Sequence, residues 1–150
     1  MSVTAFTGLL FLRGQELIED MAIASGVVVA VGDLVKTTGT VVLDTAATTD
    51  DLLMIGVAKE AHASTDPASR ISVAIRNAGA VYLAPLDAAA TVTIGELLQM
   101  YTSAPSQKLT PSATDAVAMV VKAGTSVLAA EVVLLLPNQT GSIRLVGDAS

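Results

Sequence analysis

Short apolar runs separated by Gly, Thr, Asp and Pro recur along most of the chain. Runs spaced about 8–15 residues apart, with turn residues between them, are typical of all-β sandwiches and barrels. Alternation is clearest where Ile71, Val73 and Ile75 share one face and polar side chains take the other. The pattern predicts strands within residues 26–31, 41–44, 53–59, 71–76, 80–83, 97–101, 117–122 and 127–136.

Two runs, residues 27–29 and 132–136, are continuously apolar instead of alternating. A continuous run is typical of a strand covered on both faces, either within the domain or by a partner subunit. Gly56 lies inside another run, where a glycine indicates a β-bulge or the close approach of another backbone.

The first 20 residues differ from the rest, because one short apolar run is followed there by acidic residues. We interpret residues 1–20 as an N-terminal arm with one strand at 9–13, and residues 21–150 as a single β domain. At most two short helices are expected, over residues 16–24 and 67–71. A last strand is predicted at residues 143–146.

Part of the apolar pattern occurs twice, about 63 residues apart. Residues 32–35 (GDLV) correspond to residues 95–98 (GELL), and residues 55–58 (IGVA) correspond to 118–121 (AMVV). The repeat predicts two related sets of strands within one sheet-rich domain.

Composition and charge narrow the possible functions. The chain has 150 residues, the length of one domain, and 52% of them are hydrophobic, with two Phe, two Tyr and no Trp. The core must therefore be built from Val, Ala, Leu and Ile. The net charge of −6 and the scattered positions of the eight basic residues argue against nucleic acid as a partner.

Neither a disulfide nor a membrane span is expected. The sequence contains no cysteine, so it has no disulfide framework and no thiolate metal site. Its longest apolar stretch, residues 127–136, is far shorter than the roughly 20 residues that cross a bilayer. We expect a soluble protein made in the cytoplasm.

Few side chains suited to catalysis are present. The one histidine, His62, lies close in sequence to Ser64 and Asp66, whereas members of a catalytic triad normally converge from separate elements. Asp50 and Asp51 are adjacent in a Thr-rich turn and lack the alternating spacing of a calcium loop. The glycine patterns that bind phosphate do not occur. We therefore predict no catalytic, cofactor-binding or metal-binding residues, no small-molecule substrate and no enzymatic activity.

Four motifs in order carry a family resemblance: residues 32–35 (GDLV), 55–58 (IGVA), 71–75 (ISVAI) and 79–83 (GAVYL). This series resembles the small capsid decoration (cement) proteins of tailed double-stranded-DNA bacteriophages, over about residues 26–136. The resemblance implies a compact β-tulip or jelly-roll-like domain with an extended N-terminal arm. It also implies a homotrimer, made in the host cytoplasm, that binds the major capsid protein on the outer surface of the virion head and stabilises it.

In several such families an N-terminal arm adds to capsid strands, which makes residues 1–15 the candidate anchor. An exposed strand in the arm would suit addition to the edge of a neighbouring sheet. The capsid-contact candidates are Leu9, Leu10, Phe11, Leu12 and Arg13.

Two alternatives remain open. A head fibre or tail component could use the same β domain, and electron microscopy of the particle would separate these roles. A small β-barrel ligand-binding module or enzyme would need a cleft with convergent polar side chains, and the sequence offers few aromatic residues on which a sugar could stack.

Overall fold

A computed structural model describes residues 8–44, 54–102 and 107–136. All regular structure in these residues is β, which confirms the predicted all-β class. The strands are β1 (Leu10–Gly14), β2 (Leu17–Ala22), β3 (Leu34–Thr37), β4 (Val42–Asp44), β5 (Met54–Ala58), β6 (Arg70–Ile75), β7 (Ala80–Val92), β8 (Leu97–Thr102), β9 (Lys108–Pro111), β10 (Ala116–Val120) and β11 (Gly124–Leu134).

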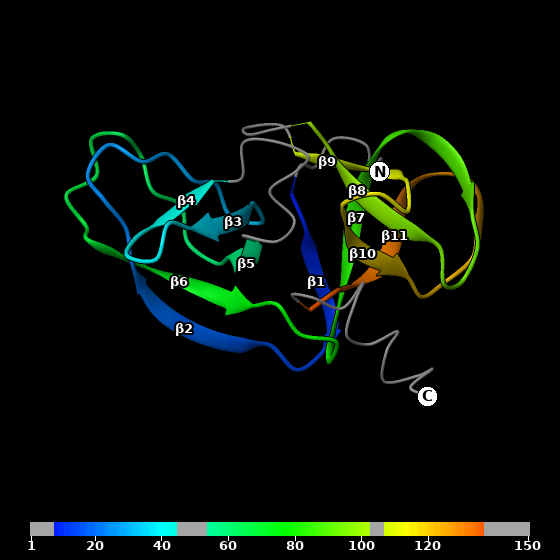
Figure 1. The fold of residues 1–150 in the computed structure, drawn as a ribbon, viewed down its shortest axis with the longest axis horizontal. Coiled ribbons are helices and arrows are strands. Elements are labelled where there is room, and N and C mark those ends of the chain that lie inside the picture. Colours follow the sequence, from blue (N-terminus) through cyan, green and yellow to red (C-terminus); the bar gives the residue numbers. More distant parts are fainter. Residues whose placement is uncertain (1–7, 45–53, 103–106, 137–150) are drawn as a thin grey trace.

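One lobe is a closed barrel, on the right in Figure 1. Its strands follow the order β7-β11-β10-β8-β9, and a parallel contact between Leu86 of β7 and Leu109 of β9 closes the ring. Strand β1 pairs antiparallel with β7 outside the ring. The predicted barrel is therefore confirmed for this half of the chain.

The second lobe, on the left in Figure 1, is a five-stranded sheet with the order β2-β6-β5-β3-β4. Neighbouring strands in it are antiparallel. Its two edge strands meet at a single parallel bridge between Ile23, directly after β2, and Val42 of β4. Within the described residues, the sheet thus curls until its edges touch at one point.

The two lobes share one strand order. Strands β2, β6, β5, β3 and β4 correspond in turn to β7, β11, β10, β8 and β9, and the closing contact is parallel in both lobes. The turns before β3 and β8 also match: the amide of Ala30 donates to the Asp33 carboxylate (2.9 Å), and that of Thr93 donates to the Glu96 carboxylate (3.1 Å). The repeat in the sequence is therefore a repeat of structure.

The larger hydrophobic core joins the lobes. Leu34, Met54, Val57 and Ala74 of the second lobe belong to the same buried cluster as the interior of the barrel. A second cluster lies on the other face of β5 and β6; its buried members are Ile23, Val29, Val35, Val42, Ala58, Ile71 and Val73. Both faces of the second lobe's central strands are therefore covered.

A buried glutamine reinforces this junction. The side chain of Gln107, just before β9, accepts a hydrogen bond from the Leu34 amide (2.6 Å) and donates one to the Leu34 carbonyl (3.0 Å). Leu34 begins β3, so the amide group ties a strand of the second lobe to the barrel.

The extended arm predicted for residues 1–20 is not seen in its described part. Strands β1 and β2 follow one another along β7 and β6, with Leu10 opposite Leu83 and Leu17 opposite Ile75. Between them the amide of Gln15 donates to the carbonyl of Gly79 (3.0 Å). Backbone pairing thus holds residues 10–22 against the rest of the molecule.

No helix forms over residues 16–24, where a short one was possible, because residues 17–22 form β2. The spacing that favoured a helix lies on an edge strand with both apolar and acidic residues exposed, and pairing with β6 decides its conformation. The second helix, over residues 67–71, is also not formed, since residues 67–69 are irregular and β6 begins at Arg70.

The strand predicted at residues 26–31 is a loop. Gly26 and Gly32 bound it with φ of 89° and 93°, and the loop covers the second core with the buried side chain of Val29. The run 132–136 is not covered on both faces either: in β11, Val132 and Leu134 are buried and Val133 between them is half-buried. The predicted strand at 143–146 and the Asp50–Asp51 pair lie outside the described residues.

Candidate functional site

The outer strands β1 and β2 are the candidate site. Each of these strands is the last one in its sheet, so they form two successive edges, one on each lobe, joined by a bend between β1 and β2 (Figure 1). The outer strand of a sheet presents backbone N–H and C=O groups to which another strand can add.

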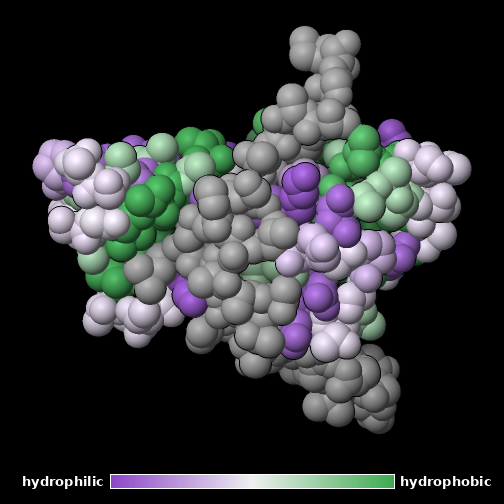
Figure 2. Space-filling model, turned by 90° about the horizontal axis from the view of Figure 1, so that it is seen from above, coloured by the Kyte–Doolittle hydropathy of each residue, from purple (hydrophilic) through white to green (hydrophobic). Residues whose placement is uncertain are grey.

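Apolar side chains accompany these edges. Leu10 and Leu12 of β1 are 53% and 37% exposed, and Leu17 and Ile18 of β2 are 55% and 46% exposed. Other exposed hydrophobic side chains occur on both lobes on the face seen from above (Figure 2). Native proteins usually blunt such edges with charged residues, so an edge with apolar side chains indicates a contact surface.

The five residues predicted to contact a capsid divide into two groups. Leu9 is buried, and its amide donates to the Gly32 carbonyl (2.8 Å). Phe11 packs edge-on against Tyr82, with 5.9 Å between ring centroids. Leu10, Leu12 and Arg13 are exposed in whole or in large part. Leu9 and Phe11 therefore hold the strand, and the other three face outward.

Arg13 also fastens β1 to the barrel. Its guanidinium donates to the Glu131 carboxylate of β11 at 2.7 Å, and Lys122 lies 3.7 Å from the same carboxylate. The hydrogen bond from Arg13 is the main cause that lowers the pKa of Glu131, and the two nearby cations contribute. The ion pair bridges β7, which lies between β1 and β11.

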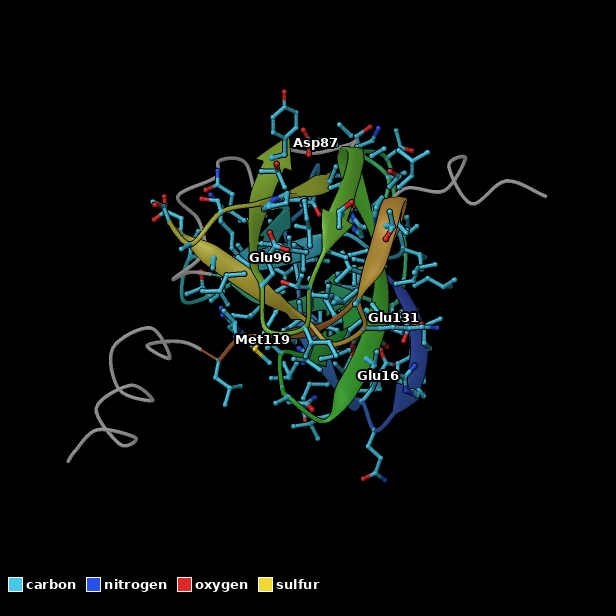
Figure 3. All side chains as sticks on the ribbon, turned by 90° about the vertical axis from the view of Figure 1, so that its right-hand side faces the viewer. Glu16, Asp87, Glu96, Met119 and Glu131 are labelled. Atoms are coloured by element: carbon cyan, nitrogen blue, oxygen red, sulfur yellow. The ribbon has the colours of Figure 1, made fainter. Side chains whose placement is uncertain are left out.

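A polar cluster fixes the edge where it passes from one lobe to the other. The Glu16 carboxylate accepts from the Tyr82 hydroxyl (2.8 Å) and from the Lys59 ammonium (3.1 Å). The Lys59 ammonium lies 5.6 Å from the Phe11 ring centroid. Burial, and then the bond to Glu16, raise the pKa of Tyr82. In Figure 3, Glu16 and Glu131 lie on the side of the molecule where β1 runs.

Sequence reasoning did not find this cluster. Its members come from the β1–β2 connection, β1, β7 and the end of β5, and no local spacing joins them. Only the tertiary pairing of β1 with β7 brings the carboxylate to the tyrosine.

His62 has a structural role. The ring is buried, and its Nδ1 and Nε2 lie 2.6 Å and 2.8 Å from the carbonyl oxygens of Val27 and Ala68. A carbonyl only accepts, so both contacts are hydrogen bonds only when the imidazole carries two protons. The bonds to Val27 and Ala68 raise the pKa of His62 accordingly, and Asp66 adds to the shift. Neither ring nitrogen is left to act on Ser64.

Two of the clefts on the surface of the described residues lie near the candidate edges. One, of about 160 Å³, lies beside Lys122 and Glu131, and the other, of about 270 Å³, lies between β2 and the turn after β3. Both are smaller than the roughly 300–1,000 Å³ of typical small-molecule sites. Within residues 8–44, 54–102 and 107–136, no three His, Asp or Glu side chains group as metal ligands. No helix there is long and apolar enough to cross a membrane.

Comparison with known proteins identifies no family for this chain. No protein-family model matches the sequence, and no curated protein matches it.

Proposed function

We propose that this protein is a virion structural protein: a capsid decoration protein that binds the outer surface of an assembled phage head as a homotrimer and stabilises it. The observation that supports the proposal best is the pair of successive edges of β1 and β2, which offer main-chain groups and apolar side chains together. The major capsid protein is the expected partner.

Strand addition along β1 is the proposed mode of binding. A capsid strand laid against this edge would hydrogen-bond to the main chain and cover Leu10 and Leu12. Burying a leucine side chain contributes about 1.5–3 kcal/mol when it becomes fully covered. Many copies on one shell would add these contributions over the particle.

The anchors behind β1 make this surface rigid before binding. Leu9, Phe11 and the Arg13–Glu131 ion pair hold the strand against the barrel. A strand that is already ordered loses less conformational entropy when it binds than a free arm would. Docking on a preformed edge thus takes the place of binding by an extended arm, which the sequence predicted.

Co-sedimentation with capsids that lack the protein tests the proposal. The wild-type chain should pellet with the capsids, whereas Leu10→Lys should lose most binding because it places a charge on the covered edge. The matched control is Ile94→Lys, which makes the same change at a side chain 71% exposed in the turn after β7. Wild-type protein that stays in the supernatant, or Leu10→Lys that pellets like the control, would contradict the proposal.

A further inference from the structure

The outer edge of β2 corresponds to the part of β7 that carries β1. The two strands hold the same place in their lobes, and residues 17–20 of β2 correspond to residues 80–83 of β7 at the 63-residue spacing of the repeat. The same spacing separates the closing residues Ile23 and Leu86. In the barrel, residues 80–83 pair antiparallel with β1. The repeat therefore contains one example of a strand added at this position.

We propose that β2 accepts an antiparallel strand in the same way, and that the strand is residues 143–147 of a second copy of this chain. The sequence of residues 143–147 (IRLVG) matches that of β1 (LFLRG) in its pattern. Both have aliphatic side chains at the first and third positions and end in glycine. The donated segment thus resembles the strand that covers the equivalent edge.

Side-chain pairing supports this occupant. If the register of β1 on β7 is repeated, Ile143 lies opposite Asp20 and Arg144 opposite Glu19, as Leu10 and Phe11 lie opposite Leu83 and Tyr82. Glu19 is exposed, and among the described residues no ion pair involves it. An opposite charge directly across two strands stabilises the pair.

Apolar contacts extend the match. In the same register Val146 would lie opposite Ile18, which is among the most exposed large hydrophobic residues of the second lobe, and Leu145 would take the place of the bulged Leu12. The Asp20 carbonyl currently accepts from the guanidinium of Arg70 (2.6 Å). Both of these side chains are exposed, so an incoming amide replaces only a solvent-exposed hydrogen bond there.

The path of the chain favours a second copy over the same chain. Strand β11 lies on the far side of β7 from β1. Directly after β11, the chain is held in place because Arg76 donates to the Leu135 carbonyl. To reach the outer edge of its own β2, the segment would cross about three strand spacings, roughly 14 Å, and then follow the bend from β1 to β2, which belongs to the other sheet. The seven steps from Leu136 to Ile143 span at most about 24 Å.

Only a segment with an extended backbone could make that crossing. The intervening residues Pro137, Asn138 and Gly141 favour turns, which shorten the reach. The edge of a neighbouring copy requires no such crossing.

One donor segment and one acceptor edge per copy give a head-to-tail contact. Such contacts close into rings, and a ring of three is the oligomer of the proposed function. The inference supplies the contact for that oligomer and in this respect rests on the proposed function. Its test uses no capsid, so that self-association and capsid binding can fail separately.

Cysteine cross-linking tests the register, because the chain has no native cysteine. In the double variant Glu19→Cys with Arg144→Cys, mild oxidation should give disulfide-linked dimers and trimers on non-reducing gels. The control, Glu19→Cys with Ile143→Cys, places the second thiol on the other face of the strand, at a position before the β-bulge, and should cross-link at least several-fold less. A cross-link within one chain, no cross-link, or equal yields in the two variants would overturn the proposal.

Charge exchange provides a second readout in solution. Glu19→Arg and Arg144→Glu should each weaken self-association about 10-fold, as measured by sedimentation velocity, since each places like charges opposite one another. The double variant should restore the wild-type oligomer. Failure of the double variant to recover, or single variants that associate like the wild type, would exclude this pairing.

Discussion

Gly32 and Gly95 hold the same position in the two lobes. Both have φ of 93°, and their amides donate to the carbonyls of Ala58 and Val120, each at 2.8 Å. Their surroundings differ, because a Cβ on Gly32 would lie 2.9 Å from the Leu9 carbonyl oxygen, whereas nothing lies within 4 Å of the same atom on Gly95. The start of β1 packs against only one of the two turns.

This difference predicts unequal costs for the same substitution. Gly95→Ala should lower the free energy of unfolding by about 1–2 kcal/mol, the cost of a positive φ for an L residue. Gly32→Ala should cost more, since the methyl group also displaces the Leu9 backbone. Urea unfolding of the two variants measures both values, and equal losses would show that the contact with Leu9 does not hold the turn.

A substitution at Gly56 should be more damaging than either. A Cβ there would lie 2.0 Å from the carbonyl oxygen of Ala74 in the neighbouring strand β6, so β5 and β6 could not keep their spacing. We expect Gly56→Ala to destabilise the protein by at least about 3 kcal/mol, the upper range for overpacking. The readout is the urea midpoint compared with that of Gly95→Ala. A loss no larger than that of Gly95→Ala would contradict the close approach.

The sequence predicted Gly56 correctly because the close approach leaves a local sign, a glycine inside an aliphatic run. The same holds for β6, where alternating Ile71, Val73 and Ile75 predicted a strand; its other face is covered as well, with Ala74 in the larger core. Strand β2 was missed because an edge strand needs few apolar residues. Its pairing with β6 joins residues about 50 positions apart in the sequence, which no local pattern shows. Strands β3 and β9 are four residues each, too short for alternation to stand out.

The candidate site was predicted only in part. Leu10 and Leu12 stood out as an apolar run and do lie on an exposed edge. The extended arm expected to carry them is not formed, because Leu9 and Phe11 in the same run fix β1 to the rest of the molecule. Nothing in the local sequence separates the inward from the outward members of such a run when a β-bulge at Leu12 shifts the register.

Gln107 should be important for the junction of the lobes. Gln107→Ala removes both of its bonds to the Leu34 backbone, in a buried place where replacement bonds to water are costly. We expect a loss of about 2–4 kcal/mol from two such bonds. Gln107→Glu keeps the size and the acceptor but removes the donor and introduces a charge, so it should not restore stability. Thermal unfolding of both variants gives the comparison, and a near-neutral Gln107→Ala would mean that the hydrophobic core alone joins the lobes.

The protonation of His62 should make stability depend on pH. Its pKa in the folded protein is raised above the ordinary value of 6.5 by hydrogen bonds to the Val27 and Ala68 carbonyls. A group with a raised folded pKa contributes stability that is fully present below the unfolded pKa and is lost as the pH rises through the folded pKa. The urea midpoint should therefore fall as the pH is raised from about 6 through the folded pKa.

His62→Gln should be less stable at low pH and should lack this decline, because an amide side chain cannot donate from both ends. Since His62 is the one histidine of the chain, NMR titration of its ring reports the folded pKa directly. A ring that titrates at or below 6.5, with a flat stability profile, would show that the imidazole is neutral and that one of the two carbonyl contacts is not a hydrogen bond.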